Sequence, residues 1–257
     1  MTELKNTDLI HIDPLFLLSH DLKTPVNTIL SSIQLIKMKS NEDDSNKPFY
    51  DYIETNSYRL LRMISNLIDI QSSDKELNLR LIDYLEFLNE FIKDVLTCVK
   101  KKTFSIELKS DLENCIFLTD EGKLKKIISN LISNSIKYCD EGCKINITIN
   151  KDNDYIYTTI EDNGPGISEE TIRMLFDSNV SISNKENDRD GLKMGLSVTK
   201  KLCLMLDGDI EFNEQKKDGA SFTFRLPLKS TDEIIIRQQS TGGYSTTDLK
   251  IEMSDLL

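Results

Sequence analysis

The sequence contains no long apolar run, no tryptophan and only five prolines in 257 residues. No stretch approaches the roughly 20 apolar residues that span a bilayer, and no N-terminal segment has the form of a signal peptide. We therefore expect a chain without a membrane span. The remaining composition, 39% hydrophobic and 29% charged residues, is that of an ordinary globular protein.

Basic residues are also scarce, because 32 Lys and Arg stand against 43 Asp and Glu, a net charge of −11. This balance argues against a nucleic-acid or anionic-membrane partner, and any phosphate ligand needs local donors. The five cysteines show no disulfide or zinc spacing. We expect Cys139 and Cys143 to be half-buried thiols in a turn, and the chain to lie in the reducing cytoplasm.

The stretch F-L-L-S-H-D-L-K-T-P-V, residues 16–26, holds one of only two histidines. Apolar residues at steps of three and four predict an amphipathic helix from about residue 13 or 14 to Lys39. They are Leu15, Leu18, Leu22, Val26, Ile29, Ile33 and Ile36. His20 lies beside this stripe, and Asp21 could hold one ring nitrogen in its N–H form. Pro25 should bend the helix at this turn. The alternative is an exposed histidine with an incidental acidic neighbour.

A polar turn, residues 40–48, separates this helix from a second one at about 49–71. Two antiparallel helices cannot bury both apolar stripes alone, so we expect a four-helix bundle with a second copy. The alternative is packing against the rest of the same chain. Beyond Asp74, alternating segments and helical segments predict an α+β sandwich. We assign residues 1–75 to the hairpin, 76–230 to the sandwich, and 231–257 to a flexible tail with one short helix at 248–256.

The predicted helix at 122–138 carries two asparagines and a lysine on one face, Asn130, Asn134 and Lys137. Asparagine is a poor helix former, so two in register suggest a use. An amide oxygen can occupy one ligand position of Mg²⁺, and Lys137 can meet a phosphate. The alternative is an ordinary solvated polar face.

Two glycine-rich stretches follow. E-D-N-G-P-G-I, residues 161–167, comes directly after a predicted strand and forms a tight turn at Gly164 and Gly166. In G-L-K-M-G-L, residues 191–196, Gly195 is expected to open a helix at about 195–206 and so to present free N–H groups to an anion.

These stretches resemble the sequence motifs of sensor histidine kinases of two-component systems. Ser19–Val26 resembles the phospho-acceptor motif, residues 130–138 the N box, and residues 161–167 the first glycine box. Leu175–Asp177 resembles the phenylalanine box, residues 191–196 the second glycine box, and Asp218–Leu228 the last motif. One departure is Lys193, which stands where the second glycine box has its middle glycine.

The resemblance implies a dimeric helical hairpin followed by a Bergerat-type (GHKL) α+β sandwich that binds ATP and Mg²⁺. It implies that His20 takes the phosphate, Asp21 is the base and Thr24 serves phosphatase chemistry. It places Mg²⁺ on Asn134, with Asn130 in support, and adenine at Asp162. The remaining nucleotide-binding residues would be Lys137, Tyr138, Gly164, Gly166, Phe176, Gly191, Lys193, Gly195, Leu196 and Thr223.

The function implied is autophosphorylation on His20 and transfer of the phosphate to an aspartate of a response regulator, with possible dephosphorylation of that regulator. One alternative is a phosphotransfer or scaffold protein whose nucleotide domain no longer turns over, which Lys193 favours and the complete N box opposes. A protein-serine kinase of the same superfamily is opposed by the complete phospho-acceptor motif.

Overall fold

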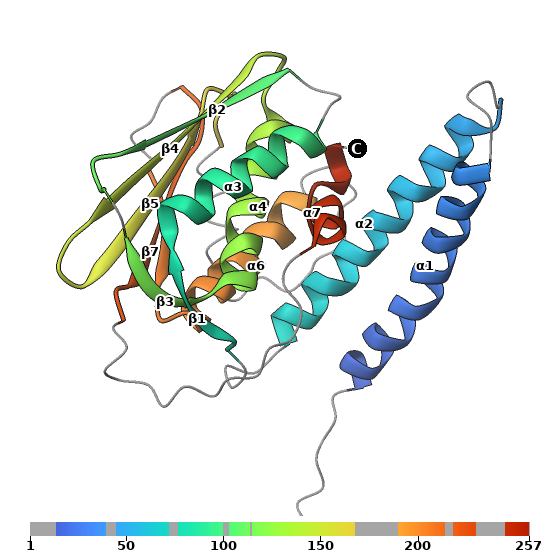
Figure 1. Cartoon of the computed structure of the whole chain (residues 1–257), viewed down its shortest axis with the longest axis horizontal. Helices are drawn as coiled ribbons and strands as arrows, with labels where there is room; N and C mark the ends of the chain where they lie inside the picture. The colour runs from blue at the N-terminus through green and yellow to red at the C-terminus, as the bar shows by residue number, and fades with distance from the viewer. Residues whose placement is uncertain are drawn as a thin grey trace, which may run out of the picture. The chain divides into compact units, whose positions relative to one another are not determined.

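The computed structural model describes residues 14–39, 45–71, 77–99, 103–113, 115–167, 190–213, 218–229 and 245–256. Its contacts divide the chain into two compact units, Met1–Gln71 and Ser72–Leu257. Figure 1 shows the first as a helical hairpin and the second as a sheet covered by helices. This architecture confirms the predicted fold class, a helical hairpin followed by an α/β sandwich.

The hairpin consists of α1 (Pro14–Lys39) and α2 (Lys47–Gln71). The first helix agrees with its predicted bounds, and it continues through Pro25. The second begins two residues before the predicted start at Phe49, because the Asn46 carbonyl accepts hydrogen bonds from the N–H groups of Phe49 and Tyr50. Pro48 is tolerated in this first turn, where an N–H would lack a helical partner.

The apolar residues of the hairpin fall on two faces. Buried side chains include Val26, Leu30 and Ile33 of α1, with Tyr58, Leu61 and Ile64 of α2. The predicted stripe is therefore split, because a single neighbouring helix covers only one side of α1. A second set remains 41–49% exposed, and it comprises Leu22, Ile29, Ile36, Ile53 and Leu60. This exposed stripe repeats every seven residues on each helix, which is typical of a coiled-coil seam.

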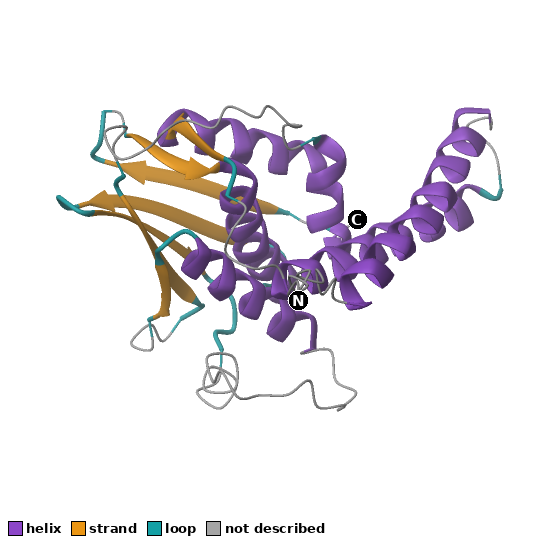
Figure 2. Ribbon diagram, turned by 90° about the horizontal axis from the view of Figure 1, so that it is seen from below, coloured by secondary structure: helices purple, strands orange, loops and turns teal. Residues whose placement is uncertain are grey.

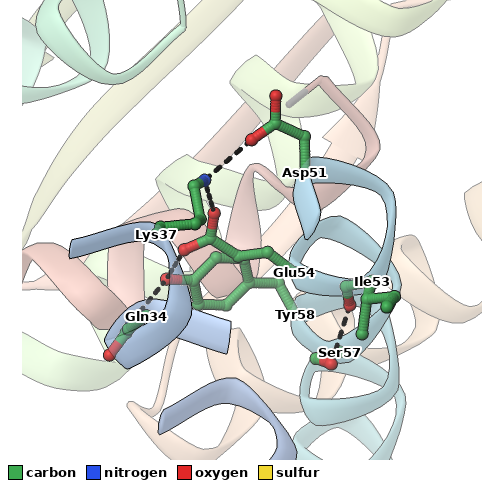
Figure 3. Close-up of polar contacts among 7 residues, drawn as sticks. All are labelled: Gln34, Lys37, Asp51, Ile53, Glu54, Ser57 and Tyr58. Atoms are coloured by element: carbon green, nitrogen blue, oxygen red, sulfur yellow. Dashed lines mark hydrogen bonds and ion pairs between the residues drawn. The ribbon is translucent and has the colours of Figure 1, made fainter. Parts of the chain in front are cut away.

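Polar side chains join the two helices near the hairpin's closed end (Figure 3). Lys37 Nζ lies 2.8 Å from Asp51 Oδ1 and 2.5 Å from Glu54 Oε2. Burial lowers the pKa of Lys37, but hydrogen bonds to the two carboxylates outweigh burial and raise it above its ordinary 10.5. The stability that these ion pairs contribute is therefore present at neutral pH. It is lost only as the pH rises through the raised pKa of Lys37.

The second unit contains a five-stranded sheet of order β2-β4-β5-β7-β6. Its strands are β2 (Phe104–Ser110), β4 (Cys143–Lys151), β5 (Tyr155–Asp162), β6 (Asp209–Phe212) and β7 (Ser221–Pro227). Only β2 and β4 are parallel, and the other neighbours are antiparallel. A separate pair is formed by β1 (Leu79–Asp83) and β3 (Ile116–Asp120). The predicted turn at Asp152 joins β4 to β5, since its carboxylate accepts the N–H groups of Asp154 and Tyr155.

Three helices lie on one face of this sheet (Figure 2): α3 (Tyr84–Cys98), α4 (Glu121–Tyr138) and α6 (Asp190–Met205). Aspartates start two of them, because Asp83 accepts N–H groups of α3 and Asp120 accepts the N–H of Lys123 in α4. The Tyr84 hydroxyl, fully buried, hydrogen-bonds Thr158 Oγ1 of β5 at 2.7 Å. The core therefore lies between the helices and the sheet, with α4 at its centre.

The predicted short helix at 248–256 is present, but residues 245–256 pack on the core and are not part of a flexible tail. Residues 245–256 form α7 (Thr246–Glu252) and a 3₁₀ turn (Ser254–Leu256), and α7 contacts α3 and α4. A capping box between Ser245 and Asp248 begins the helix. Leu249, Met253 and Leu256 are 7% exposed or less and join the core. The segment folds because it covers apolar surface on α3 and α4, which polar composition alone did not indicate.

Candidate nucleotide and phospho-acceptor sites

The phospho-acceptor turn lies in the first half of α1, where the backbone of His20 and Asp21 is helical. Their side chains lie outside the described set. Thr24 is exposed one turn further on, and its carbonyl accepts a hydrogen bond from Thr28 Oγ1 at 3.0 Å. Pro25 lacks the N–H that would bond to the Asp21 carbonyl. The hairpin thus carries these residues on one continuous helix.

The two asparagines of α4 face α6, as their shared helix face predicts. The Asn130 amide donates to the Gly195 carbonyl and to Thr199 Oγ1, both at 3.4 Å. Asn134 is 8% exposed, and its Nδ2 is buried without a hydrogen-bond partner among the described residues. A buried amide in this state is costly unless a ligand completes it. Helix α4 therefore presents the Asn134 amide nitrogen, which has no hydrogen-bond partner in the described part of the chain, beside α6.

Gly195 lies beside both asparagines, but it does not open the helix as predicted. It lies inside α6, which begins five residues earlier at Asp190, so its N–H is not at the helix end. A side chain added at Gly195 would place Cβ 3.9 Å from both Asn130 Oδ1 and Asn134 Nδ2. Glycine at this position keeps the space beside the two amides open.

Asp162 ends β5 and is buried, with 8% exposure. Its Oδ1 accepts hydrogen bonds from the Gly164 and Ala220 N–H groups, both at 2.9 Å. Its Oδ2 accepts the Ser135 hydroxyl at 2.8 Å. The carboxylate is therefore held at both oxygens by three elements of the sandwich.

Three positions near Asp162 require glycine, each for its own physical reason. Gly164 needs its small size, because an added Cβ would lie 2.8 Å from Cys139 Sγ. Gly166 and Gly219 both have positive φ, +76° and +92°, which favours glycine. At Gly219 an added Cβ would also lie 1.8 Å from the Asp162 carbonyl oxygen. The loop and the start of β7 thus approach Asp162 more closely than larger residues would permit.

Lys137 and Tyr138 form the last turn of α4, and the Lys137 ammonium lies 5.4 Å from the centre of the Tyr138 ring. Both side chains are half-buried. They follow Asn134 on the same helix, two and three residues after Ser135, which hydrogen-bonds Asp162. The geometry brings together the predicted residues Asn130, Asn134, Asp162, Gly164 and Gly195, with Lys137 and Tyr138 at the helix end.

Two predicted nucleotide contacts lie elsewhere. Thr223 hydrogen-bonds Thr159 across β7 and β5 at 2.9 Å. Side chains alternate along a strand, and the neighbouring Thr158 bonds to Tyr84 beneath the helices, so Thr223 lies on the opposite face of the sheet. The side chain of Leu196 is 2% exposed and belongs to the core. Strand register and helix rotation decide both placements, and the sequence motif did not specify either.

Some predicted residues cannot be placed. Phe176 lies outside the described residues, and so does the side chain of Lys193, whose backbone, like that of Gly191, belongs to the first turn of α6. The two cysteines expected to be half-buried are instead 4% and 2% exposed, because Cys139 follows α4 directly and Cys143 begins β4.

Sequence reasoning missed Ser135 and Ala220, which hold Asp162. Ser135 stands next to Asn134, on the neighbouring face of the helix. Its hydroxyl in a mostly apolar row is a weak signal for a buried hydrogen bond. Ala220 acts through its backbone, which no residue type reveals. The preceding D-G pair, a turn signal, was the available hint for Gly219.

Comparison with known families agrees with this geometry. Residues 17–76 match HisKA, the His Kinase A (phospho-acceptor) domain. Residues 119–230 match HATPase_c, described as histidine kinase-, DNA gyrase B- and HSP90-like ATPase. The first match contains α1 and α2, and the second contains α4, Asp162 and α6. None of the described helices is long and apolar enough to cross a membrane.

Several curated proteins are similar over most of this chain. Sensor histidine kinase RcsC of Escherichia coli is 29% identical over 215 residues, which is 82% of this chain and 22% of RcsC. Histidine kinase P4 of Formosa agariphila is 31% identical over 255 residues, 93% of this chain and 18% of that protein. The sensor kinase/phosphatase LuxQ of Vibrio parahaemolyticus is 26% identical over 90% of this chain and 28% of LuxQ. The chain thus spans only 18–28% of the length of these relatives.

Solved structures share the fold. Full-length ShkA, crystallised with AMPPNP, superposes on 84% of this chain and 46% of its own with a TM-score of 0.67 at 20% identity. The histidine kinase AdeS of Acinetobacter baumannii covers 82% of this chain and 98% of its own, with a TM-score of 0.51 at 22% identity. With the HisKA and HATPase_c matches following one another along the chain, this chain belongs to the sensor histidine kinases.

Proposed function

We propose that the chain is an ATP-dependent protein histidine kinase that phosphorylates itself on His20 and passes the phosphate to an aspartate of a response-regulator receiver domain. One imidazole nitrogen of His20 would attack the γ-phosphorus of ATP and ADP would leave, with Asp21 taking the other ring proton. Catalysis of this kind depends on positioning and charge compensation.

One observation carries the proposal: Asn134, with an unpartnered buried amide, and the buried Asp162 carboxylate belong to adjoining parts of one site. Asp162 would accept the amine of adenine, and Lys137 would meet a phosphate. The intact pair of asparagines supports this function over a phosphotransfer protein with an inactive nucleotide domain.

The same residues fit Mg²⁺ as well as ATP. Among the described residues, no three His, Cys, Asp or Glu side chains converge. An ion at Asn134 would therefore take most of its ligands from phosphates and water, the arrangement that Mg²⁺ prefers with nucleotides. Turning the Asn134 amide by 180° would exchange its nitrogen and oxygen and place an oxygen ligand at the unpartnered position. When bound, the ion supplies charge compensation for the phosphates.

Incubation of the purified protein with γ-labelled ATP and Mg²⁺ tests the proposal. We expect an acid-labile, base-stable label on the wild type and a loss of at least about a hundredfold in Asn134→Asp. A carboxylate there would repel the phosphates and lack the amide donor. Ser133→Ala, at the neighbouring position, should label normally. An unlabelled wild type that also fails to bind ATP would overturn the kinase proposal.

We also propose that the hairpin pairs with a second copy. The exposed stripe of Leu22, Ile29, Ile36, Ile53 and Leu60 supports this, because monomers rarely leave a continuous apolar face in water. A HisKA domain matches the same residues. The free cysteines fit a reducing compartment, and we place the reaction in the cytoplasm. The name of LuxQ supports adding dephosphorylation of the regulator, at the Thr24 turn.

The dimer is tested by Ile29→Glu and Leu60→Glu. Each substitution buries a carboxylate if a second hairpin covers the stripe, and burying that charge costs more than about 1.4 kcal/mol. The dissociation constant of the dimer should therefore increase at least tenfold. Ser31→Glu is the matched control, since two residues further on α1 turns by about 200°. Sedimentation equilibrium measures the association, and circular dichroism checks the helices. Equal association in all variants would contradict pairing through this stripe.

A further inference from the structure

In the part of the chain that the structure describes, Ser135 is the one residue whose side chain hydrogen-bonds Asp162 Oδ2. It lies in the last full turn of α4, is 7% exposed, and directs its hydroxyl at Asp162 Oδ2, 2.8 Å away. Its carbonyl accepts the Cys139 N–H at 3.0 Å and the Cys143 thiol at 3.6 Å. These contacts fix the backbone of Ser135, so its hydroxyl has a defined position.

A carboxylate offers about four acceptor positions, two on each oxygen. The N–H groups of Gly164 and Ala220 occupy both positions on Oδ1, and Ser135 occupies one on Oδ2. A single position remains, on Oδ2. Because the three occupied positions are filled by protein donors inside a buried site, water does not need to enter to satisfy the carboxylate.

We propose that Ser135 is a positioning and specificity-determining residue that leaves Asp162 one acceptor position, on Oδ2, and so selects a base with an exocyclic amine. This inference rests on the proposed nucleotide site. A 6-amino group donates to that position. A 6-keto group presents an acceptor to an acceptor and leaves both without a partner, which is unfavourable when the groups are buried. Without the hydroxyl, a water molecule could occupy the second position on Oδ2 and bridge to a keto group.

The test compares binding of ATP with binding of inosine triphosphate, which carries a keto group in place of the amine. Calorimetry measures both affinities on the full chain, so no phosphoryl transfer is needed. For Ser135→Ala we expect ATP affinity to fall about tenfold, because the carboxylate is no longer held in the orientation that the amine of adenine requires, and inosine triphosphate affinity to change less. The ratio of the two affinities should therefore decrease. Ser135→Thr keeps the hydroxyl and should restore the ratio.

Ser133→Ala is the control for a merely structural effect. Ser133 lies on the same helix with 1% exposure, and its hydroxyl makes no hydrogen bond among the described residues. Its removal should leave the ratio unchanged, and thermal unfolding checks that each variant is folded. An unchanged ratio in Ser135→Ala, an equal change in Ser133→Ala, or a wild type that binds both nucleotides alike would overturn the inference. A wild type that binds ATP selectively but acquires no label would contradict the kinase proposal and still support the role of Ser135.

Discussion

Replacing His20 by glutamine is expected to remove the phosphoryl label completely while ATP affinity stays within about twofold of wild type. Glutamine is neutral and hydrogen-bonds like histidine, but its amide nitrogen is not a nucleophile near neutral pH. Nucleotide binding should survive because His20 belongs to the unit Met1–Gln71, whereas Asn134 and Asp162 belong to Ser72–Leu257. Labelling with γ-labelled ATP and calorimetric titration measure the two quantities.

His11→Gln is the control for this experiment, because His11 is the other histidine of the chain. It should label like the wild type. Label that persists in His20→Gln and disappears in His11→Gln would show that His11, and not His20, is the phosphate acceptor. Acid-stable label that persists in both would identify a hydroxyl acceptor and favour the protein-serine kinase alternative.

Gly219→Ala is expected to destabilise the second unit by more than about 4 kcal/mol, among the largest effects of single substitutions, and to abolish ATP binding. The alanine Cβ would lie 1.8 Å from the Asp162 carbonyl oxygen and 2.7 Å from its carbonyl carbon. Both are backbone atoms, so β5 and β7 would have to separate where Asp162 N donates to the Ala220 carbonyl at 3.0 Å. The Ala220 N–H bond to the Asp162 carboxylate would be lost with them.

Gly142→Ala separates this clash from backbone strain. Gly142 also has a positive φ, +78°, but an added Cβ would meet no atom within 4 Å. It should cost only about 1–2 kcal/mol, the penalty for an L-residue in the left-handed region, and leave ATP affinity intact. Denaturant unfolding and calorimetry compare the pair. Equal losses of stability would show that the positive φ, and not the close approach to the Asp162 backbone, makes glycine necessary at position 219.

Much of the architecture could be read from local patterns. The stripes at steps of three and four placed α1 and α2, and the alternating and helical segments beyond Asp74 predicted the sandwich. Asn130, Asn134 and Lys137 were predicted to share a face because a helix fixes their relative directions. Such predictions succeed when the period of a single element decides the outcome.

The tertiary structure decided what depends on contacts between distant segments. Thr223 lies on the far face of the sheet because the register of β7 against β5 assigns it there. Gly195 lies inside α6, beside the asparagines of α4, and not at a helix start. Residues 245–256 fold because α3 and α4 present apolar surface for them to cover.

By itself, the sequence determined the two kinds of domain and their order, and it singled out the candidate residues of the site, since these follow from periodicity and from motifs within single segments. Only the tertiary structure decided which of those residues meet. Asp162 is held by Ser135, Gly164 and Ala220, which lie 27 residues before it, two after it and 58 after it. The physical reason is that a buried carboxylate requires hydrogen bonds, and only the folded chain brings those donors to it.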